Sequence, residues 1–165
     1  MKKLLIAYYT ETNTTKEIAE AIGRIAAEKE WECDIKALSD ISSVKAYDAV
    51  LVGAPVHAMR WVPEANAFVE KHRETLQKTP TAYYAVAYLL NCSRPFFQKL
   101  IRKSLDKACG IVTPVKTGMF DGRVESEFPA FPRWIFGVKP GTAPDLRDWE
   151  AVEKWTKALF DILDK

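Results

Sequence analysis

Short apolar runs alternate along the chain with longer stretches in which apolar residues recur at helical spacing. The short runs predict five strands, at Leu4–Tyr9, Trp31–Leu38, Asp48–Pro55, Thr81–Leu90 and Ile111–Thr117. The longer stretches predict four helices, at Thr14–Glu30, Pro63 to about Leu76, Pro95–Ala108 and Asp148–Leu163. Alternating strands and helices are typical of βαβ units. We therefore expect an α/β fold in one domain, residues 1–165, with a five-stranded parallel sheet between two layers of helices.

The turn between the first strand and the first helix is rich in hydroxyl groups, since residues 10–15 read TETNTT. A helix N-terminus presents unpaired backbone N–H groups and a partial positive charge, so this turn predicts a phosphate site. One threonine would suit an ordinary helix cap, whereas four favour the phosphate. We also expect a left-handed backbone at or next to Asn13, because asparagine tolerates positive φ.

Ligands of doubly wound sheets bind outside the carboxyl ends of the strands, where the strand order reverses. We expect the order 2-1-3-4-5, which places this switch point between the first and third strands. The threonine-rich turn would then face the loop of residues 53–61 that follows the third strand.

The threonine-rich turn resembles the phosphate loop of the flavodoxin superfamily, Ser/Thr-x-Thr-Gly-x-Thr, with Asn13 in the place of the usual glycine. This strand order, with the flavin at its switch point, is that of flavodoxins, so both the order and the flavin position are implied by the resemblance. The resemblance implies a flavodoxin-like three-layer sandwich that binds FMN. The cofactor-binding residues that it implies lie in three loops: Thr10, Glu11, Thr12, Asn13, Thr14, Thr15, Pro55, Val56, His57, Ala58, Trp61, Leu89, Leu90 and Asn91.

The aromatic residue in the second loop, Trp61, has two interpretations. It stacks on the flavin ring, as an aromatic in this loop often does in flavodoxins, or it packs as a hydrophobic staple at the start of the next helix. In the third loop, backbone amides around Asn91 would bind the pyrimidine edge of the ring. The lone Cys92 in this loop is more typical of inert packing than of a reactive thiol.

Within the superfamily, the chain resembles the flavodoxin-type protoporphyrinogen oxidases at three places, Gly53–His57, Gly118–Arg123 and Asp148–Val152. This resemblance implies an oxidoreductase that moves electrons between a reduced donor or substrate and an acceptor such as a quinone. Its sharpest form is a protoporphyrinogen dehydrogenase.

Residues 120–146, after the last predicted strand, form an aromatic-rich insertion without a clean period. Loops of this length in compact domains are usually functional or disordered, and aromatic density argues against disorder. The insertion either covers the edge strand of the sheet or forms an apolar lid beside the flavin, flanked by Arg123, Arg133 and Lys139. A lid of this kind would suit a porphyrinogen-like or quinone substrate, or peripheral contact with the membrane that carries quinones.

Composition narrows the function classes. The chain has 24 basic and 22 acidic residues, a balance that gives no support to nucleic-acid binding. Its three separated cysteines and two histidines favour a reduced, cytoplasmic protein without a metal site. There is no Walker motif, no acidic cluster typical of receiver domains and no acid–base or nucleophilic constellation, so we expect no catalytic side chain.

Charge also bears on the kind of flavoprotein. Carrier flavodoxins are typically strongly acidic, and a sequence pI near 8.4 favours an oxidoreductase instead. An electron carrier with a redox partner protein and a non-catalytic flavin-binding module are the alternatives. Homodimer formation is left open by the sequence.

Overall fold

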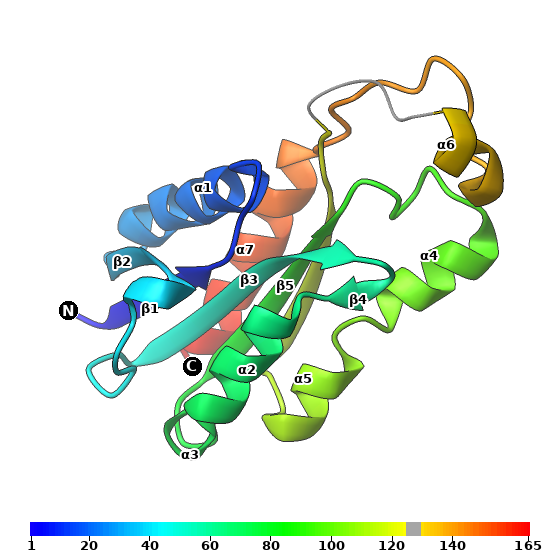
Figure 1. Cartoon of the computed structure of the whole chain (residues 1–165). Helices are drawn as coiled ribbons and strands as arrows, with labels where there is room; N and C mark the ends of the chain where they lie inside the picture. Colours follow the sequence, from blue (N-terminus) through cyan, green and yellow to red (C-terminus); the bar gives the residue numbers. More distant parts are fainter. Residues whose placement is uncertain (125–129) are drawn as a thin grey trace.

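Five parallel strands form the centre of the molecule (Figure 1), which we describe from a computed structural model covering residues 1–124 and 130–165. They are β1 (Lys3–Tyr8), β2 (Glu32–Ala37), β3 (Ala49–His57), β5 (Thr81–Ala87) and β6 (Lys116–Asp121). Their spatial order is β2-β1-β3-β5-β6, which confirms the predicted order when the parallel strands alone are counted. The sequence interpretation missed β4 (Arg60–Trp61), which pairs antiparallel with the end of β3.

Helices cover both faces of the sheet because its strands alternate their apolar side chains between the two faces. In β1, Leu4 and Ile6 pack toward α1 (Thr14–Glu28) and α7 (Trp149–Leu163). Leu5 and Ala7 point to the opposite face, where the core includes α2 (Pro63–Lys71), α3 (Arg73–Leu76) and α5 (Asp106–Ile111). The remaining helices are η1 (Leu38–Asp40), α4 (Pro95–Arg102) and α6 (Ala130–Phe136).

Three predicted elements were wrong in their bounds. The expected strand at Ile111–Thr117 overlaps the end of α5, and the strand itself runs over Lys116–Asp121. Pro114 lies between the two, and a proline has no N–H for the ladder of a sheet. The expected helix Pro95–Ala108 is divided into α4 and α5, and the helix from Pro63 into α2 and α3.

The insertion leaves and re-enters the domain as a paired stem. Val124 N–H donates to the Pro144 carbonyl at 2.8 Å, and Leu146 N–H donates to the Gly122 carbonyl at 3.1 Å. Figure 1 shows the insertion beyond the carboxyl ends of the strands, with α6 beside α4 rather than along the edge of the sheet. Residues 125–129, which belong to the predicted insertion, lie outside the described residues. Within the described part of the chain, no helix has the length and apolar character needed to cross a membrane.

Candidate functional site

The ends of the first and third strands meet at the predicted switch point. Tyr8 at the end of β1 pairs with Gly53 of β3, and the Tyr9 N–H donates to the Gly53 carbonyl at 2.9 Å. Beyond this pair β1 and β3 are no longer paired, and the threonine-rich turn lies opposite the loop after β3. The sequence prediction that these two loops face each other is confirmed.

The backbone of the threonine-rich turn reverses at Asn13. This residue has φ 62° and ψ −5°, the left-handed conformation expected from the sequence, and its side chain makes no capping hydrogen bond to α1. The hydroxyls of Thr12 and Thr14 lie 3.1 Å apart. The turn therefore places threonine hydroxyls at the N-terminus of α1, and the Asn13 side chain leaves the first N–H groups of this helix uncapped.

A buried tyrosine holds the first turn of α1 against the sheet. The Tyr84 hydroxyl donates to the carbonyl of Thr15 at 3.1 Å. A Cβ atom at Gly53 would lie 1.9 Å from Tyr84 Cζ, so the tyrosine ring occupies the space that a side chain at Gly53 would fill. The sequence interpretation missed this support, because the signal is one glycine in an apolar strand.

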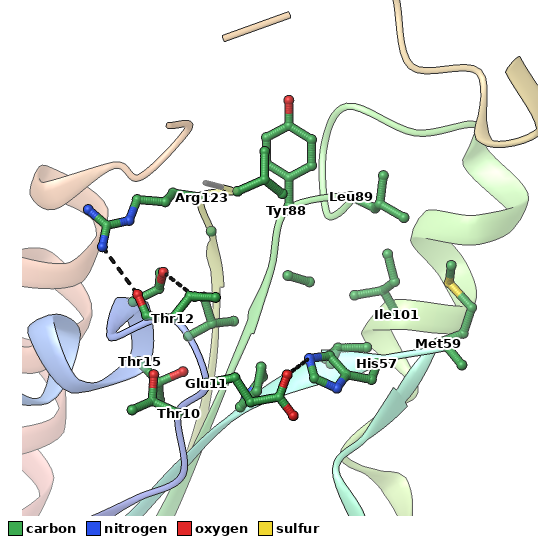
Figure 2. A pocket seen from close by; sticks show the side chains of 18 residues that line it. Thr10, Glu11, Thr12, Thr15, His57, Met59, Tyr88, Leu89, Ile101 and Arg123 are labelled. Atoms are coloured by element: carbon green, nitrogen blue, oxygen red, sulfur yellow. Dashed lines mark hydrogen bonds and ion pairs between the residues drawn. The ribbon is translucent and has the colours of Figure 1, made fainter. Parts of the chain in front are cut away.

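A cavity of about 430 Å³ opens between the threonine-rich turn, the loop after β3 and the loop after β5 (Figure 2). Ten of the predicted site residues line it: Thr10, Glu11, Thr12, Thr14, Thr15, Pro55, Val56, His57, Ala58 and Leu89. Hydroxyl groups therefore gather at one end. The lining residues that were not predicted are mostly apolar: Met59, Val86, Ala87, Tyr88, Ile101, Gly122, Arg123 and Val124.

The loop after β3 is a tight hairpin with a strained turn. Ala58 and Met59, between β3 and β4, have φ angles of 47° and 63°. Two-residue hairpin turns with both φ angles positive normally carry Asn or Gly, so alanine and methionine here store backbone strain beside the cavity. Next to this turn, His57 Nε2 lies 3.7 Å from a carboxylate oxygen of Glu11, on the facing loop (Figure 2).

Four predicted site residues do not line the cavity: Asn13, whose backbone reverses the threonine-rich turn, and Trp61, Leu90 and Asn91. Trp61 is fully buried, its Nε1–H donates to the Ala54 carbonyl at 3.1 Å and its ring packs against Tyr83. Stacking on a flavin is therefore the wrong interpretation, and Trp61 anchors the hairpin to the core. Leu90 is also buried, and the Asn91 amide donates to Asp121 at 2.7 Å on the outer side of the loop. Tyr88 and Leu89 are the residues of this loop that reach the cavity.

An ionic network joins the threonine-rich turn to the insertion. Arg123 Nη2 donates to the Thr12 carbonyl at 3.2 Å and to a Glu17 carboxylate oxygen at 3.3 Å. The other oxygen of Glu17 accepts from Arg147, which also binds Asp145 at 2.7 Å. The Arg147 guanidinium holds the pKa of Asp145 below its usual range. The Arg147 side chain is largely buried in this network. The sequence did not reveal the network, because its charged residues are far apart along the chain and only the fold brings them together.

The thiol near the cavity is not activated. Cys92 Sγ donates to the Tyr88 carbonyl at 2.9 Å, and burial raises the pKa of the thiol. The neutral thiol is a poor nucleophile, so Cys92 packs as a small apolar group.

Comparison with known proteins agrees with this geometry. A family model described as "Flavodoxin domain" matches residues 5–134. Solved structures that match nearly the whole chain include the following three. A short-chain flavodoxin associated with a PDU bacterial microcompartment has TM-score 0.64 and 13% identity, covering 99% of each chain. Flavodoxin 1 from Bacillus cereus has TM-score 0.57 and 14% identity, covering 99% of this chain and 98% of its own. An NADH:FMN oxidoreductase in its apo form has TM-score 0.59 and 11% identity, covering 99% and 89%. No curated protein sequence matches the chain.

The cofactor of flavodoxins, FMN, fits the residues around the cavity. Its phosphate matches the hydroxyls of the threonine-rich turn and the first amides of α1. Its flat ring system matches the apolar part of the wall, from Val56 and Met59 to Leu89 and Ile101. The polar and apolar ends of the cavity therefore correspond to the two ends of this cofactor.

Proposed function

Because the chain belongs to the flavodoxin domain family, we propose that it is an FMN-dependent oxidoreductase that passes electrons to a flat, largely apolar acceptor of the quinone type. Bound FMN supplies the electron chemistry. The protein binds the cofactor through the threonine-rich turn, encloses its ring between the hairpin and the loop after β5, and limits the access of water.

An acceptor-binding enzyme is supported by the fact that the insertion forms part of the cavity wall. Gly122, Arg123 and Val124, at the start of the insertion, line the cavity itself. The far arm of the insertion is held in place by the Tyr88 hydroxyl, which donates to the Ala143 carbonyl at 2.8 Å. A molecule that enters on this side therefore contacts the insertion as well as the cofactor.

The chemistry of this wall favours a flat acceptor with acidic groups or developing negative charge. Val124 and Tyr88 supply apolar contact, and Arg123 lines the same cavity with its guanidinium held by the Thr12 carbonyl and Glu17. A reduced quinone, or a porphyrinogen with carboxylate arms, combines an apolar ring with negative charge in this way. A porphyrinogen is the second substrate class that we propose to test.

The test is the reoxidation of the chemically reduced, FMN-loaded protein, followed by stopped-flow absorbance. We expect a water-soluble quinone to reoxidise it with a rate that saturates with quinone concentration, as binding in the cavity requires. Ferricyanide, a small metal complex, serves as an acceptor that needs no apolar site. Protoporphyrinogen is assayed separately as an electron donor to the oxidised protein.

Val124→Asp supplies the matched variant, because a carboxylate in the apolar wall would lose its hydration when a neutral quinone binds, which should raise the KM for the quinone at least tenfold. Val115→Asp is the control, since Val115 is exposed at the other end of β6, away from the cavity. Quinone rates that are linear in concentration, and equal in both variants, would contradict the proposal and favour an electron carrier that acts on a redox partner protein.

A further inference from the structure

Two helices that pack against each other, α4 and α6, expose large apolar side chains to solvent. On α4, Phe96 and Leu100 are 66% and 37% exposed, and on α6, Trp134 and Ile135 are 76% and 42% exposed. We call these four residues, with the basic residues around them, the α4–α6 surface. Large apolar groups of this kind lower the free energy when they leave water, so their clustering marks a contact surface.

The two helices are fixed to one another, so the surface is preformed. The rings of Phe97 and Phe136 pack edge to face with their centroids 4.6 Å apart, and Phe96 packs on Phe97 at 5.4 Å. The Arg94 N–H donates to the Phe136 carbonyl at 2.7 Å, where the end of α6 meets the start of α4. A rigid surface loses little conformational entropy when it is covered.

Charge is segregated toward the same two segments. Residues 93–105 and 130–142 contain six basic residues and no acidic ones, whereas the rest of the chain contains 18 basic and 22 acidic residues. The six are Arg94, Lys99, Arg102, Lys103, Arg133 and Lys139. Positive charge is therefore concentrated along α4 and its C-terminal end, where Lys99 and Lys103 are exposed.

Basic and apolar side chains share one face of α4 and its C-cap residue, Lys103. Phe96, Lys99, Leu100 and Lys103 follow the spacing i, i+3, i+4, i+7, and all four are exposed. Helices with this pattern lie in the interface of an anionic bilayer, with apolar side chains below the headgroups and cations among them. A protein partner would need a matching acidic and apolar surface, whereas a bilayer with anionic lipids supplies both properties everywhere.

We infer that the α4–α6 surface docks this protein onto an anionic lipid bilayer. Ile101, the buried residue of the same α4 helix, lines the cavity, so docking brings the wall of the cofactor cavity to the membrane surface. Docking would give the protein access to apolar quinones, which reside in the bilayer. This role of docking rests on the proposed function. Docking itself follows from the surface alone.

The test is flotation of the purified full chain with vesicles of phosphatidylcholine alone and of phosphatidylcholine with phosphatidylglycerol. We expect binding to the anionic vesicles only, reversal by high salt, and a blue shift of tryptophan fluorescence as Trp134 leaves water. Vesicle binding needs no electron acceptor, so it holds or fails independently of quinone reduction.

Variants separate the apolar and the basic contributions. Lys99→Gln with Lys103→Gln should weaken vesicle binding at least tenfold, and Phe96→Ser with Trp134→Ser should weaken flotation by a similar factor. The controls remove the same groups elsewhere: Lys45→Gln with Lys78→Gln for charge, and Ile162→Ser for an exposed apolar residue. Thermal melting and FMN binding show that each variant is folded.

Three results would overturn the inference. The first is an absence of binding to either vesicle type. The second is equal weakening by the control variants. The third is a dimer in analytical ultracentrifugation that the Phe96→Ser and Trp134→Ser variant dissociates, which would assign the surface to a second copy of the chain.

Discussion

Arg123 donates a hydrogen bond from the start of the insertion to the carbonyl of Thr12 in the threonine-rich turn, at 3.2 Å. The hydroxyl-rich end of the cavity and the insertion are thereby held in one arrangement. Glu17 on α1 and Arg147 near the end of the insertion continue the link. Binding of the cofactor and placement of the insertion are expected to depend on each other.

Arg123→Gln tests this link. Loss of the guanidinium frees the Thr12 peptide and one side of Glu17, so we expect FMN to bind about tenfold more weakly, in keeping with one lost charge-assisted hydrogen bond. Riboflavin, which has no phosphate, should be affected less. Titration of the apo protein with both flavins measures the two constants. Arg24→Gln, on the exposed side of α1, is the control. Equal losses for both flavins would contradict a role at the phosphate end.

Gly53→Ala tests the support beneath the turn. The new Cβ would overlap the Tyr84 ring, whose hydroxyl holds the Thr15 carbonyl. We expect the free energy of unfolding to fall by about 3 kcal/mol and FMN binding to weaken, since the ring must shift. Gly110→Ala in α5 is a matched control, because no atom lies within 4 Å of its added Cβ. Its helix propensity should make that variant neutral or more stable by about 0.5–1 kcal/mol. Chemical denaturation distinguishes the two.

Trp61→Phe separates packing from cofactor contact. The variant loses the hydrogen bond to the Ala54 carbonyl, so we expect a loss of about 1–3 kcal/mol in the free energy of unfolding. The absorbance and the fluorescence quenching of bound FMN should stay unchanged, because Trp61 does not line the cavity. A rise in flavin fluorescence in this variant, absent from Trp149→Phe, would restore the stacking hypothesis.

Asp121→Asn tests the pH dependence. Burial raises the pKa of Asp121, at the carboxyl end of β6, above its ordinary value. A carboxyl whose pKa is higher in the folded state stabilises the fold below its unfolded pKa, and this stability is lost as the pH rises through the folded pKa. The variant should therefore melt at a higher temperature than the parent protein at pH 7. The difference should vanish below about pH 3.9, where the carboxyl is protonated in both states. Asp161→Asn, an exposed change in α7, should show no such crossover.

Features of the fold that depend on a short stretch of sequence could be predicted from the sequence alone. Apolar runs such as Leu4–Tyr9 and the threonine-rich turn predicted the buried strands, the left-handed Asn13 and the loops that meet at the cavity, whereas the strand order came from the resemblance to flavodoxins. These predictions succeeded because each rests on local chemistry, namely burial of a strand, a helix N-terminus or the conformational range of asparagine.

Contacts between distant segments were beyond the sequence. Nothing local shows that the Trp61 indole faces Ala54 and Tyr83 rather than the cavity, since an aromatic before a helix suits both interpretations. Arg123 and Arg147 were scattered charges until the fold brought them to Glu17. The strand at Lys116–Asp121 was misplaced because Ile111 and Val112, which pack in the core at the end of α5, continue the apolar run.

The two sides of the cavity are held by different forces. The strained Ala58–Met59 turn is fixed by the buried Trp61, whereas the insertion is tied to α1 through Glu17 and its two arginines. Salt screens partly exposed ion pairs and leaves apolar packing intact or stronger. Raising the ionic strength should therefore weaken the attachment of the insertion to α1, while the hairpin wall around Ala58 and Met59 keeps its shape.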